Sequence, residues 1–311
     1  SYSVKSVDKS KMKKTPPAPF ITSTLQQDAF NKLRISNKAT MAIAQQLYEG
    51  VEIGDEGPVG LITYMRTDSV RVADEAATAA REVIGKLYGA EYVPETARKH
   101  KTSKSAQDAH EAIRPTDPSL TPTSIKKYLS REQNKIYDLI WRRFMASQMS
   151  AAEYDVVTVE VEGGRFLFKA AQQKMTFDGY TIVYNGDKDD EAKGFPAVKQ
   201  GEALKLAEVR PAQHFTEPPP RFNAGSLVKE LESNGIGRPS TYAAIISVLL
   251  ERKYITDDKR RFMPTPLGKM VNKILIASFP DIFSEEFTAK MEGELDKIED
   301  GSYTWVDTLN D

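Results

Sequence analysis

Hydrophobic and polar positions change their spacing twice along this chain of 311 residues. Up to about residue 150, apolar side chains recur every three or four positions, which is typical of amphipathic helices. The expected helices begin at Ser23, at Ser36, near Ala73 and at Ser130. Ser130 and Gln133 have the spacing of a capping box, which favours a helix start at that point.

The middle of the chain alternates with a period of two, which predicts strands. Apolar residues alternate at 157–161 and at 166–168 on either side of Gly163-Gly164, so we expect a β-hairpin there. Further strands are expected at 181–184 and 203–209. The first 19 residues, rich in Lys and ending in Pro, form either one strand or a linker.

Helical spacing returns after Pro218-Pro219-Pro220. The expected elements are a helix with Leu227 and Leu231, a turn at 234–237, a helix at 240–252, a hairpin at 254–263 and a last helix at 287–298. A helix, a turn, a second helix and a hairpin, in this order, outline a winged helix.

The charge balance and the residue types exclude several classes of functional site. The 43 Lys and Arg residues nearly balance 44 Asp and Glu, so any surface for a polyanion has to be local. The lack of cysteine excludes disulfides, thiolate catalysis and cysteine-bound metals. The three histidines lie far apart, and no apolar run is long enough to span a membrane. We expect a soluble protein of a reducing compartment.

Residues 62–69, Ile-Thr-Tyr-Met-Arg-Thr-Asp-Ser, bring a phenol and a guanidinium together at the expected end of a strand. Tyr64 could attack a phosphate, and Arg66 carries a fork that matches phosphate oxygens. Because tyrosine has an ordinary pKa of about 10, Tyr64 would need cations nearby to react at neutral pH. Alternatively, Tyr64 packs against the core and Thr67 or Asp68 caps the next helix, which is a common arrangement.

A second group is Gln107-Asp-Ala-His-Glu-Ala-Ile-Arg-Pro-Thr116. In a helix, His110 and Arg114 would share one face, because they are four positions apart. They could contact a phosphate there, with His110 donating or relaying a proton. The alternative is an ordinary helix end in which His110 pairs with Glu111.

A third group is Asn234-Gly-Ile-Gly-Arg-Pro-Ser-Thr-Tyr242. Its glycines permit close backbone approach, and Ser240 and Thr241 present hydroxyls at a helix start, which favours anion binding. Arg252, three turns later, could reach the same backbone. A helix-turn-helix that binds protein explains the pattern equally well.

The acidic segment 187–191 is a candidate metal loop. It lacks the glycine and the distal glutamate of a calcium-binding loop. We therefore expect the whole connection at 186–194 to be a solvated loop, and we predict no metal ligands in this chain.

Four motifs follow one another in the order found in a known enzyme family. They are Pro19-Phe-Ile-Thr-Ser-Thr-Leu-Gln-Gln27, Leu61-Ile-Thr-Tyr-Met-Arg-Thr-Asp-Ser69, Ala109-His-Glu-Ala-Ile-Arg-Pro115, and Ser226-Leu-Val-Lys-Glu-Leu-Glu232 with Gly235-Ile-Gly-Arg-Pro-Ser-Thr-Tyr-Ala243. With these motifs the chain resembles the bacterial type IA DNA topoisomerases, from Pro19 to beyond Met291.

The resemblance implies a role for each candidate residue. Tyr64 would attack the scissile phosphodiester and become linked to a 5′ phosphate, while Arg66 holds that phosphate and His110 lies near it. These three residues are the expected catalytic set. The expected DNA-binding residues are Arg114, Arg238, Ser240, Thr241 and Arg252.

The resemblance also implies a multidomain α and β fold. Two helical, winged-helix-like domains would be joined by a strand-rich arch as part of a torus. Residues 1–23 and 151–220 would form the arch, 24–150 the helical domain that bears Tyr64, and 221–311 part of the helical DNA-channel domain.

The implied activity is relaxation of negatively supercoiled DNA through single-strand cleavage, strand passage and religation. It needs no ATP, because one phosphodiester is exchanged for another. Mg²⁺ is implied for the full-length enzyme, but the acidic domain that binds it and the C-terminal zinc-ribbon region are missing from this chain. We therefore expect a monomeric core fragment that does not relax DNA alone. It would belong to a protein of the bacterial cytoplasm that works on the nucleoid without membrane contact.

Two other functions fit the same residues. The first is a non-catalytic module that binds single-stranded DNA through the winged-helix-like segment. The second is a protein-interaction scaffold, which would have no affinity for oligonucleotides. The loop at 51–58 is longer than is usual before the tyrosine motif.

Overall fold

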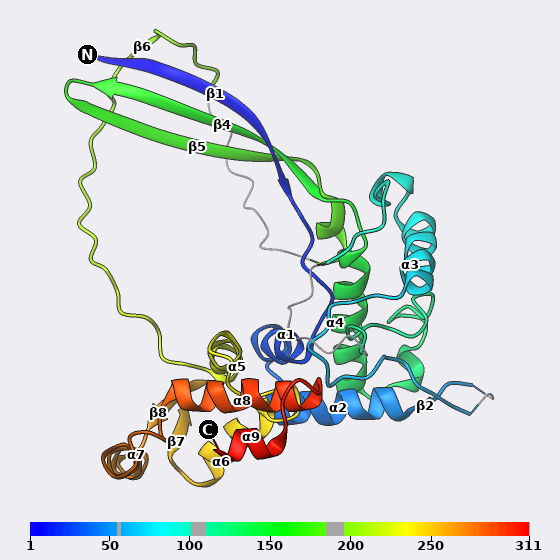
Figure 1. Cartoon of the computed structure of the whole chain (residues 1–311). Coiled ribbons are helices and arrows are strands. Elements are labelled where there is room, and N and C mark those ends of the chain that lie inside the picture. The colour runs from blue at the N-terminus through cyan, green and yellow to red at the C-terminus, as the bar shows by residue number, and fades with distance from the viewer. Residues whose placement is uncertain (55–56, 101–109, 185–195, 311) are drawn as a thin grey trace. The chain divides into compact units, whose positions relative to one another are not determined.

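The computed structural model describes residues 1–54, 57–100, 110–184 and 196–310, and Figure 1 shows their helices and strands. The chain divides into two compact units. Unit 1 consists of Ser1–Pro17, Ala80–Arg98 and Met145–Pro218, and unit 2 consists of Ala18–Ala79, Lys99–Phe144 and Pro219–Asp311. The last division falls inside the proline run that the sequence marks as a boundary. The acidic loop expected at 186–194 lies outside the described residues.

Unit 1 is built on an antiparallel sheet with the strand order β5-β4-β1-β6. Its strands are β1 (Tyr2–Lys14), β4 (Ala152–Gly163), β5 (Phe166–Phe177) and β6 (Ala203–Leu204). The Lys-rich start is therefore a strand, and it runs beside β4 over its whole length (Figure 1). The predicted hairpin is confirmed, since Gly163 pairs with Phe166 and Gly164 takes a left-handed φ of 61°.

Two strand predictions in unit 1 need correction. Residues 179–182 form a short 3-10 helix, η4 (Gly179–Ile182), in place of the strand expected at 181–184. Gly179 turns the chain there with φ 50°, and the Thr181 hydroxyl donates to the Asp178 carbonyl at 2.7 Å. The strand expected at 203–209 is only two residues long. In both places, local turns and exposed polar positions prevail over the apolar pattern.

Unit 2 is mainly helical. Its elements are α1 (Thr22–Asp28), η1 (Ala29–Leu33), α2 (Asn37–Glu49), β2 (Val51–Glu52), β3 (Pro58–Val59), η3 (Lys126–Tyr128), α5 (Ala224–Ser233), α6 (Tyr242–Glu251), β7 (Ile255–Asp258), β8 (Arg261–Pro264), α7 (Pro266–Ser278), α8 (Glu285–Glu299) and α9 (Trp305–Asn310). Helices α3 (Asp74–Leu87) and α4 (Arg131–Ser147) contribute to both units, and η2 (Ala90–Tyr92) belongs to unit 1. The predicted mixture of helices and strands is confirmed.

The start of α4 forms the predicted capping box. The Gln133 backbone N–H donates to the Ser130 hydroxyl at 3.1 Å, and the Ser130 N–H donates to the Gln133 side chain at 2.9 Å. The sequence analysis missed α7 and α9. A signal for α7 was available, because Pro266 occupies the first helical turn and the Thr265 hydroxyl accepts from the Gly268 N–H at 3.0 Å.

Unit 2 contains two groups of buried apolar side chains. One includes Phe20, Leu25, Leu47, Leu61, Ile62, Met65, Ile113, Ile136, Tyr137 and Phe144, all at most 1% exposed. The other consists of Phe30, Ala224, Val228, Tyr242, Ile246 and Phe262. The first group includes residues that flank Tyr64, and the second underlies the helices of the third sequence group.

Phe30 enters the second group from a π-helical turn. The turn η1 follows α1 without a break and ends at Arg34, which has a left-handed φ of 63°. Across the described ranges, none of the helices combines the length and the apolar character needed to cross a membrane.

Candidate functional site

Tyr64 lies on an irregular segment rather than at the end of a strand. Its neighbourhood is held by a single antiparallel bridge between Ile62 and Pro115. The Thr63 N–H donates to the Arg114 carbonyl at 2.9 Å, and the Arg114 N–H donates to the Thr63 hydroxyl at 3.0 Å. The tyrosine and histidine motifs are therefore paired through their backbones, although the expectation of a strand is wrong.

The start of α1 fixes the other side of the same segment. The Thr22 hydroxyl donates to the Met65 carbonyl at 2.7 Å and accepts from the Thr67 N–H at 2.9 Å. All three residues are buried, whereas the Arg66 side chain between them is exposed. The segment is thus anchored on both sides of an exposed guanidinium.

The Tyr64 ring lies beside two other rings and is 36% exposed. The ring centroid of His110 is 5.6 Å away, and that of Tyr48 is 5.4 Å away in an edge-to-face arrangement. The structure thus brings Tyr64 and His110 together as the resemblance implies. The sequence analysis missed Tyr48, whose only signal is its position in the last turn of a helix shortly before the motif.

Close backbone approach places Tyr48 there. The Leu61 N–H donates to the Leu47 carbonyl at 2.7 Å, which ties the end of α2 to the segment before Tyr64. A Cβ on Gly60 would lie 2.8 Å from the Tyr48 carbonyl oxygen, which real Cβ atoms do not tolerate. Glycine at position 60 therefore allows the contact between the two rings.

His110 and Arg114 do not lie on a helix. Residues 110–115 are extended, and Ile113 forms a bridge with Phe20. The Arg114 side chain is only 13% exposed, and it donates to the Glu111 carboxylate at 2.7 Å and to the Pro115 carbonyl at 3.1 Å. In this structure Arg114 stabilises the extended segment that carries His110.

Arg66 and Ser240 line one pocket of about 380 Å³. Its other lining residues are Lys38, Met41, Pro239, Ala243, Ala244, Ser247, Val248 and Glu251. The tyrosine motif and the segment before α6 therefore meet at this pocket. The pocket combines an exposed guanidinium, a hydroxyl and apolar side chains, and its volume lies in the range of small-ligand sites.

Helix α6 begins at Tyr242, two residues later than predicted. The Thr241 hydroxyl accepts from the Arg238 N–H at 2.8 Å, so it closes the turn before the helix. Ser240 and Thr241 are exposed. Arg252 is also exposed and lies at the C-terminal end of α6, about 15 Å from its start for a ten-residue helix.

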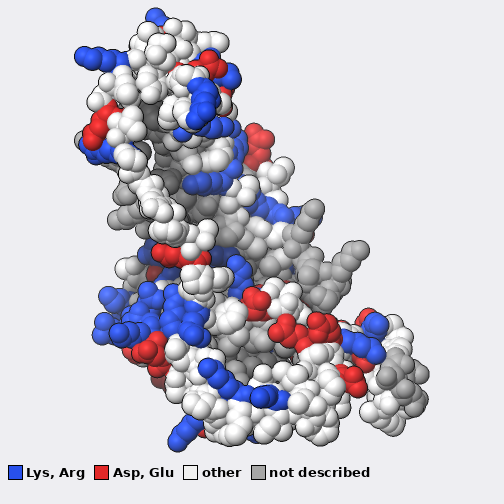
Figure 2. Space-filling view, turned by 90° about the vertical axis from the view of Figure 1, so that its left-hand side faces the viewer, with Lys and Arg blue, Asp and Glu red and all other residues white. Residues whose placement is uncertain are grey.

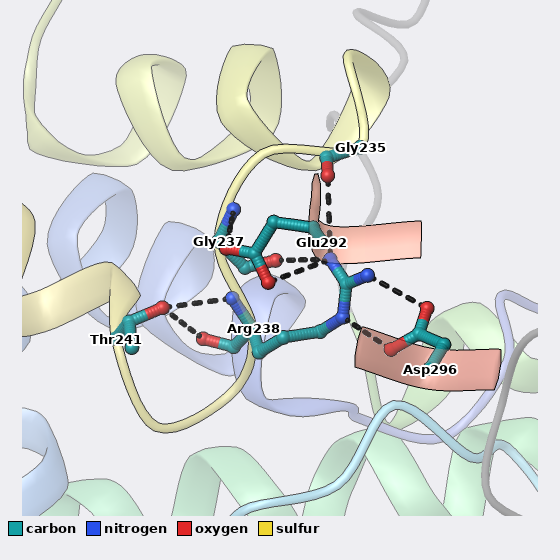
Figure 3. Close-up of polar contacts among 6 residues, drawn as sticks. All are labelled: Gly235, Gly237, Arg238, Thr241, Glu292 and Asp296. Carbon is teal, nitrogen blue, oxygen red and sulfur yellow. Dashed lines mark hydrogen bonds and ion pairs between the residues drawn. The ribbon is translucent and has the colours of Figure 1, made fainter. Parts of the chain in front are cut away.

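Arg238 is engaged with α8 (Figure 3). Its guanidinium donates to both carboxylate oxygens of Asp296, at 3.0 and 2.7 Å, and lies 3.5 Å from Glu292. Burial opposes the charged form, but hydrogen bonding and charge from Asp296, followed by Glu292, outweigh it and raise the pKa of Arg238.

Helix α5 is connected to both α1 and α2. The Ser23 hydroxyl donates to the Glu232 carboxylate at 2.7 Å, and the Asn37 side chain donates to the Ala224 carbonyl at 3.3 Å. Burial, followed by the charge of Glu232, raises the pKa of Tyr242 to about 12. All four sequence motifs therefore gather in unit 2 around the Tyr64 segment.

Within the described parts of the chain, no three His, Asp or Glu side chains lie close enough to hold a metal ion. The acidic segment 187–191 is outside those parts. The described residues therefore offer no cluster of carboxylates that would fit Mg²⁺.

Comparison with known proteins identifies the family. The family model described as DNA topoisomerase matches residues 1–310. DNA topoisomerase 1 of Rickettsia felis is 48% identical over the whole chain, and that of Xylella fastidiosa is 45% identical over 94% of it. The chain spans 41% and 37% of these relatives. The structure of full-length topoisomerase I from Thermotoga maritima matches 99% of this chain and 50% of that protein, with a TM-score of 0.88 and 43% identity. This chain therefore belongs to the bacterial type IA DNA topoisomerase family.

Proposed function

We propose that this chain is the tyrosine-bearing core of an enzyme that opens and reseals one strand of DNA. The observation that carries the proposal is the Tyr64 segment itself. Its phenol is partly exposed beside His110, and the guanidinium two residues later faces a pocket shared with Ser240. A packed structural tyrosine would need neither the exposure nor the anchoring on both sides.

The reaction conserves the bond type. The Tyr64 phenol oxygen bonds to phosphorus, the bond from phosphorus to the 3′ oxygen breaks, and the DNA is left with a 5′-phosphotyrosyl link. The phenol loses its proton and the leaving 3′ oxygen gains one, so no net proton is needed. Because one phosphodiester replaces another, resealing is the reverse step and needs no ATP.

Arg66 and His110 serve this exchange in different ways. The Arg66 fork stabilises the negative charge that grows on the phosphate oxygens. His110, whose ring lies next to the Tyr64 ring, donates or relays a proton near the phosphate. Relief of negative supercoiling drives strand passage through the open break.

The single strand reaches the site along α6. Ser240 and Arg66 contact phosphates from the shared pocket, and Thr241 and Arg252 extend the contact along α6. Arg114 and Arg238, which the resemblance also assigns to DNA, have their guanidinium groups on carboxylates in this structure. Lys and Arg side chains gather in patches on the face in Figure 2, which supports a local DNA surface on a chain of net charge −1.

The larger architecture remains part of the proposal. The order α5, turn, α6, β7 and β8 supports a winged helix. An arch at 1–23 and 151–220, a helical domain at 24–150 and a channel domain at 221–311 would contribute to a torus. The enzyme would act as a monomer in the bacterial cytoplasm, on the DNA of the nucleoid.

Mg²⁺ would be held by carboxylates outside the described residues, which do not form a site for it. We therefore expect this chain alone not to relax supercoiled DNA. Its own residues supply the nucleophile, the phosphate contacts and the strand path.

A covalent trap tests the catalytic role. The 311 residues would replace the matching segment of the Rickettsia felis enzyme, and adducts with an oligonucleotide would be trapped by denaturation. Tyr64→Phe should abolish the adduct and spare binding, whereas the control Tyr254→Phe, which also removes one hydroxyl, should form it normally. An adduct that survives Tyr64→Phe would remove the catalytic assignment. The second candidate, a non-catalytic single-strand-binding module, predicts binding without any adduct.

A further inference from the structure

The turn between α5 and α6 is held by α8. Gly235 and Gly237 have φ of 70° and 79°, a conformation that favours glycine. A Cβ on Gly237 would lie 3.1 Å from the Tyr242 ring, so the turn packs tightly against α6. The Gly237 N–H donates to the Glu292 carboxylate of α8 at 3.0 Å. The backbone of the turn is thus attached to a helix about 55 residues away in sequence.

The Arg238 side chain strengthens the same attachment (Figure 3). Its Nη1 donates to the carbonyls of Gly237 and Gly235 at 2.8 and 3.3 Å, while Nε and Nη2 donate to Asp296. Four of the five N–H groups of a guanidinium are therefore used inside the protein. The side chain is only 29% exposed.

The local charge does not favour a phosphate at this guanidinium. One positive charge on Arg238 faces two carboxylates, those of Glu292 and Asp296. A phosphate that approached it would meet a net negative group and would have to displace a bidentate ion pair. In contrast, Ser240 and Arg66 are exposed and face the same pocket.

We propose that Arg238 is a positioning residue, which fastens the glycine turn to α8 and so holds the exposed hydroxyls of Ser240 and Thr241 toward the DNA strand. The inference rests on the proposed function in one respect, namely that DNA is what these hydroxyls contact. It differs from the role implied by the resemblance, in which Arg238 itself contacts the strand.

The test compares the effects of removing each partner on binding of a single-stranded oligonucleotide to this chain. Arg238→Ala and Asp296→Ala should each weaken binding about tenfold, because each releases the turn. The double variant should be no weaker than the single ones, since both remove one attachment. The dependence of affinity on salt should keep its slope in all three, because no phosphate contact is lost.

Direct contact between Arg238 and DNA makes the opposite predictions. Arg238→Ala would then lower the salt slope by about one phosphate contact. Asp296→Ala would free the guanidinium and strengthen binding. Either result would overturn the positioning role.

Two further variants sharpen the comparison. Arg238→Lys keeps the charge but loses the fork, so binding should be as weak as in Arg238→Ala. Recovery of wild-type affinity by lysine would contradict the proposal. Lys290→Ala is the matched control, because its ion pair with Glu294 at 3.4 Å lies within α8, and it should bind normally.

Hydrogen exchange provides a readout that does not depend on DNA. Amides of the turn at 235–241 and of α8 should exchange faster in Arg238→Ala and in Asp296→Ala, and at the normal rate in Lys290→Ala. Unchanged exchange in the first two variants would refute the attachment. A wild-type chain that binds no oligonucleotide would contradict the proposed DNA contact, and exchange would still decide whether Arg238 fastens the turn.

Discussion

Two backbone N–H groups join Thr22 to Thr67. The Thr22 N–H donates to the Thr67 carbonyl at 2.9 Å, and the Thr67 N–H donates back to the Thr22 hydroxyl at 2.9 Å. Both residues are at most 1% exposed. The first turn of α1 is therefore part of the support on which Arg66 is presented.

Thr22→Val tests this support, because valine has the same shape without the hydroxyl. The buried Thr67 N–H would lose its partner, which should lower the free energy of unfolding by about 1–3 kcal/mol. The measurement is the midpoint of urea unfolding. Thr78→Val, which removes an exposed hydroxyl from α3, is the control and should change the midpoint little. Equal midpoints in the two variants would contradict the importance of the hydroxyl.

Tyr48 should restrict the orientation of the Tyr64 ring. Tyr48→Leu removes the edge-to-face contact at 5.4 Å, and we expect adduct formation in the full-length chimaera to slow by about two- to tenfold. Tyr48→Phe keeps the ring and should keep the rate. Glu49→Ala, in the same helical turn, is the control. Equal rates for the leucine and phenylalanine variants would show that the ring contact has no effect.

Two glycine substitutions should have opposite effects on stability. Gly60→Ala places a methyl group 2.8 Å from the Tyr48 carbonyl oxygen, and the strain should cost about 1–3 kcal/mol. Gly293→Ala meets nothing within 4 Å in α8 and should stabilise the chain by about 0.5–1 kcal/mol. Thermal unfolding of both variants is the measurement, and a stable Gly60→Ala variant would argue against the close approach.

Alkaline pH should destabilise unit 1 through Tyr92. Its hydroxyl donates to Asp178 at 2.8 Å, and this bond, followed by burial and the charge of Asp178, raises the pKa of Tyr92 to about 12. Because the pKa is higher in the folded state than the ordinary value of about 10, the stabilisation is complete below pH 10. It should be lost as the pH rises from about 10 to about 12.

Ultraviolet titration of tyrosinate and the pH dependence of unfolding are the measurements for Tyr92. Asp178→Asn should bring the Tyr92 pKa back toward its ordinary value. Tyr92→Phe should remove part of the stability loss at high pH. A titration curve that Asp178→Asn leaves unchanged would refute the link.

Elements with local signals could be predicted from the sequence. The capping box at Ser130, the hairpin at Gly163-Gly164 and the break at Pro218 each depend on residues close together in the chain, and each is present. The family could also be predicted, because four separate motifs carry the resemblance. The helices α2 and α8 could be predicted as well, because apolar residues recur in them at helical spacing.

Contacts between distant segments could not be predicted. Tyr64 looked like the end of a strand, yet the bridge that holds its segment joins Ile62 to Pro115, more than 50 positions away. Similarly, Arg238 resembled a free DNA-binding cation, and its partner Asp296 lies 58 positions further along. No local pattern reveals such pairs, since their geometry depends on how the helices pack.

The π-helical turn η1 limits how the length of the chain can vary between relatives. A π turn holds more residues than an α turn, and here it ends at the left-handed Arg34 while directing Phe30 into a buried cluster. Deleting one residue from 29–33 would let the segment wind as an ordinary helix. The deletion would then rotate everything that follows by about 100° relative to Phe30. Gaps in alignments of related enzymes should therefore avoid these five positions, even where the residue types differ.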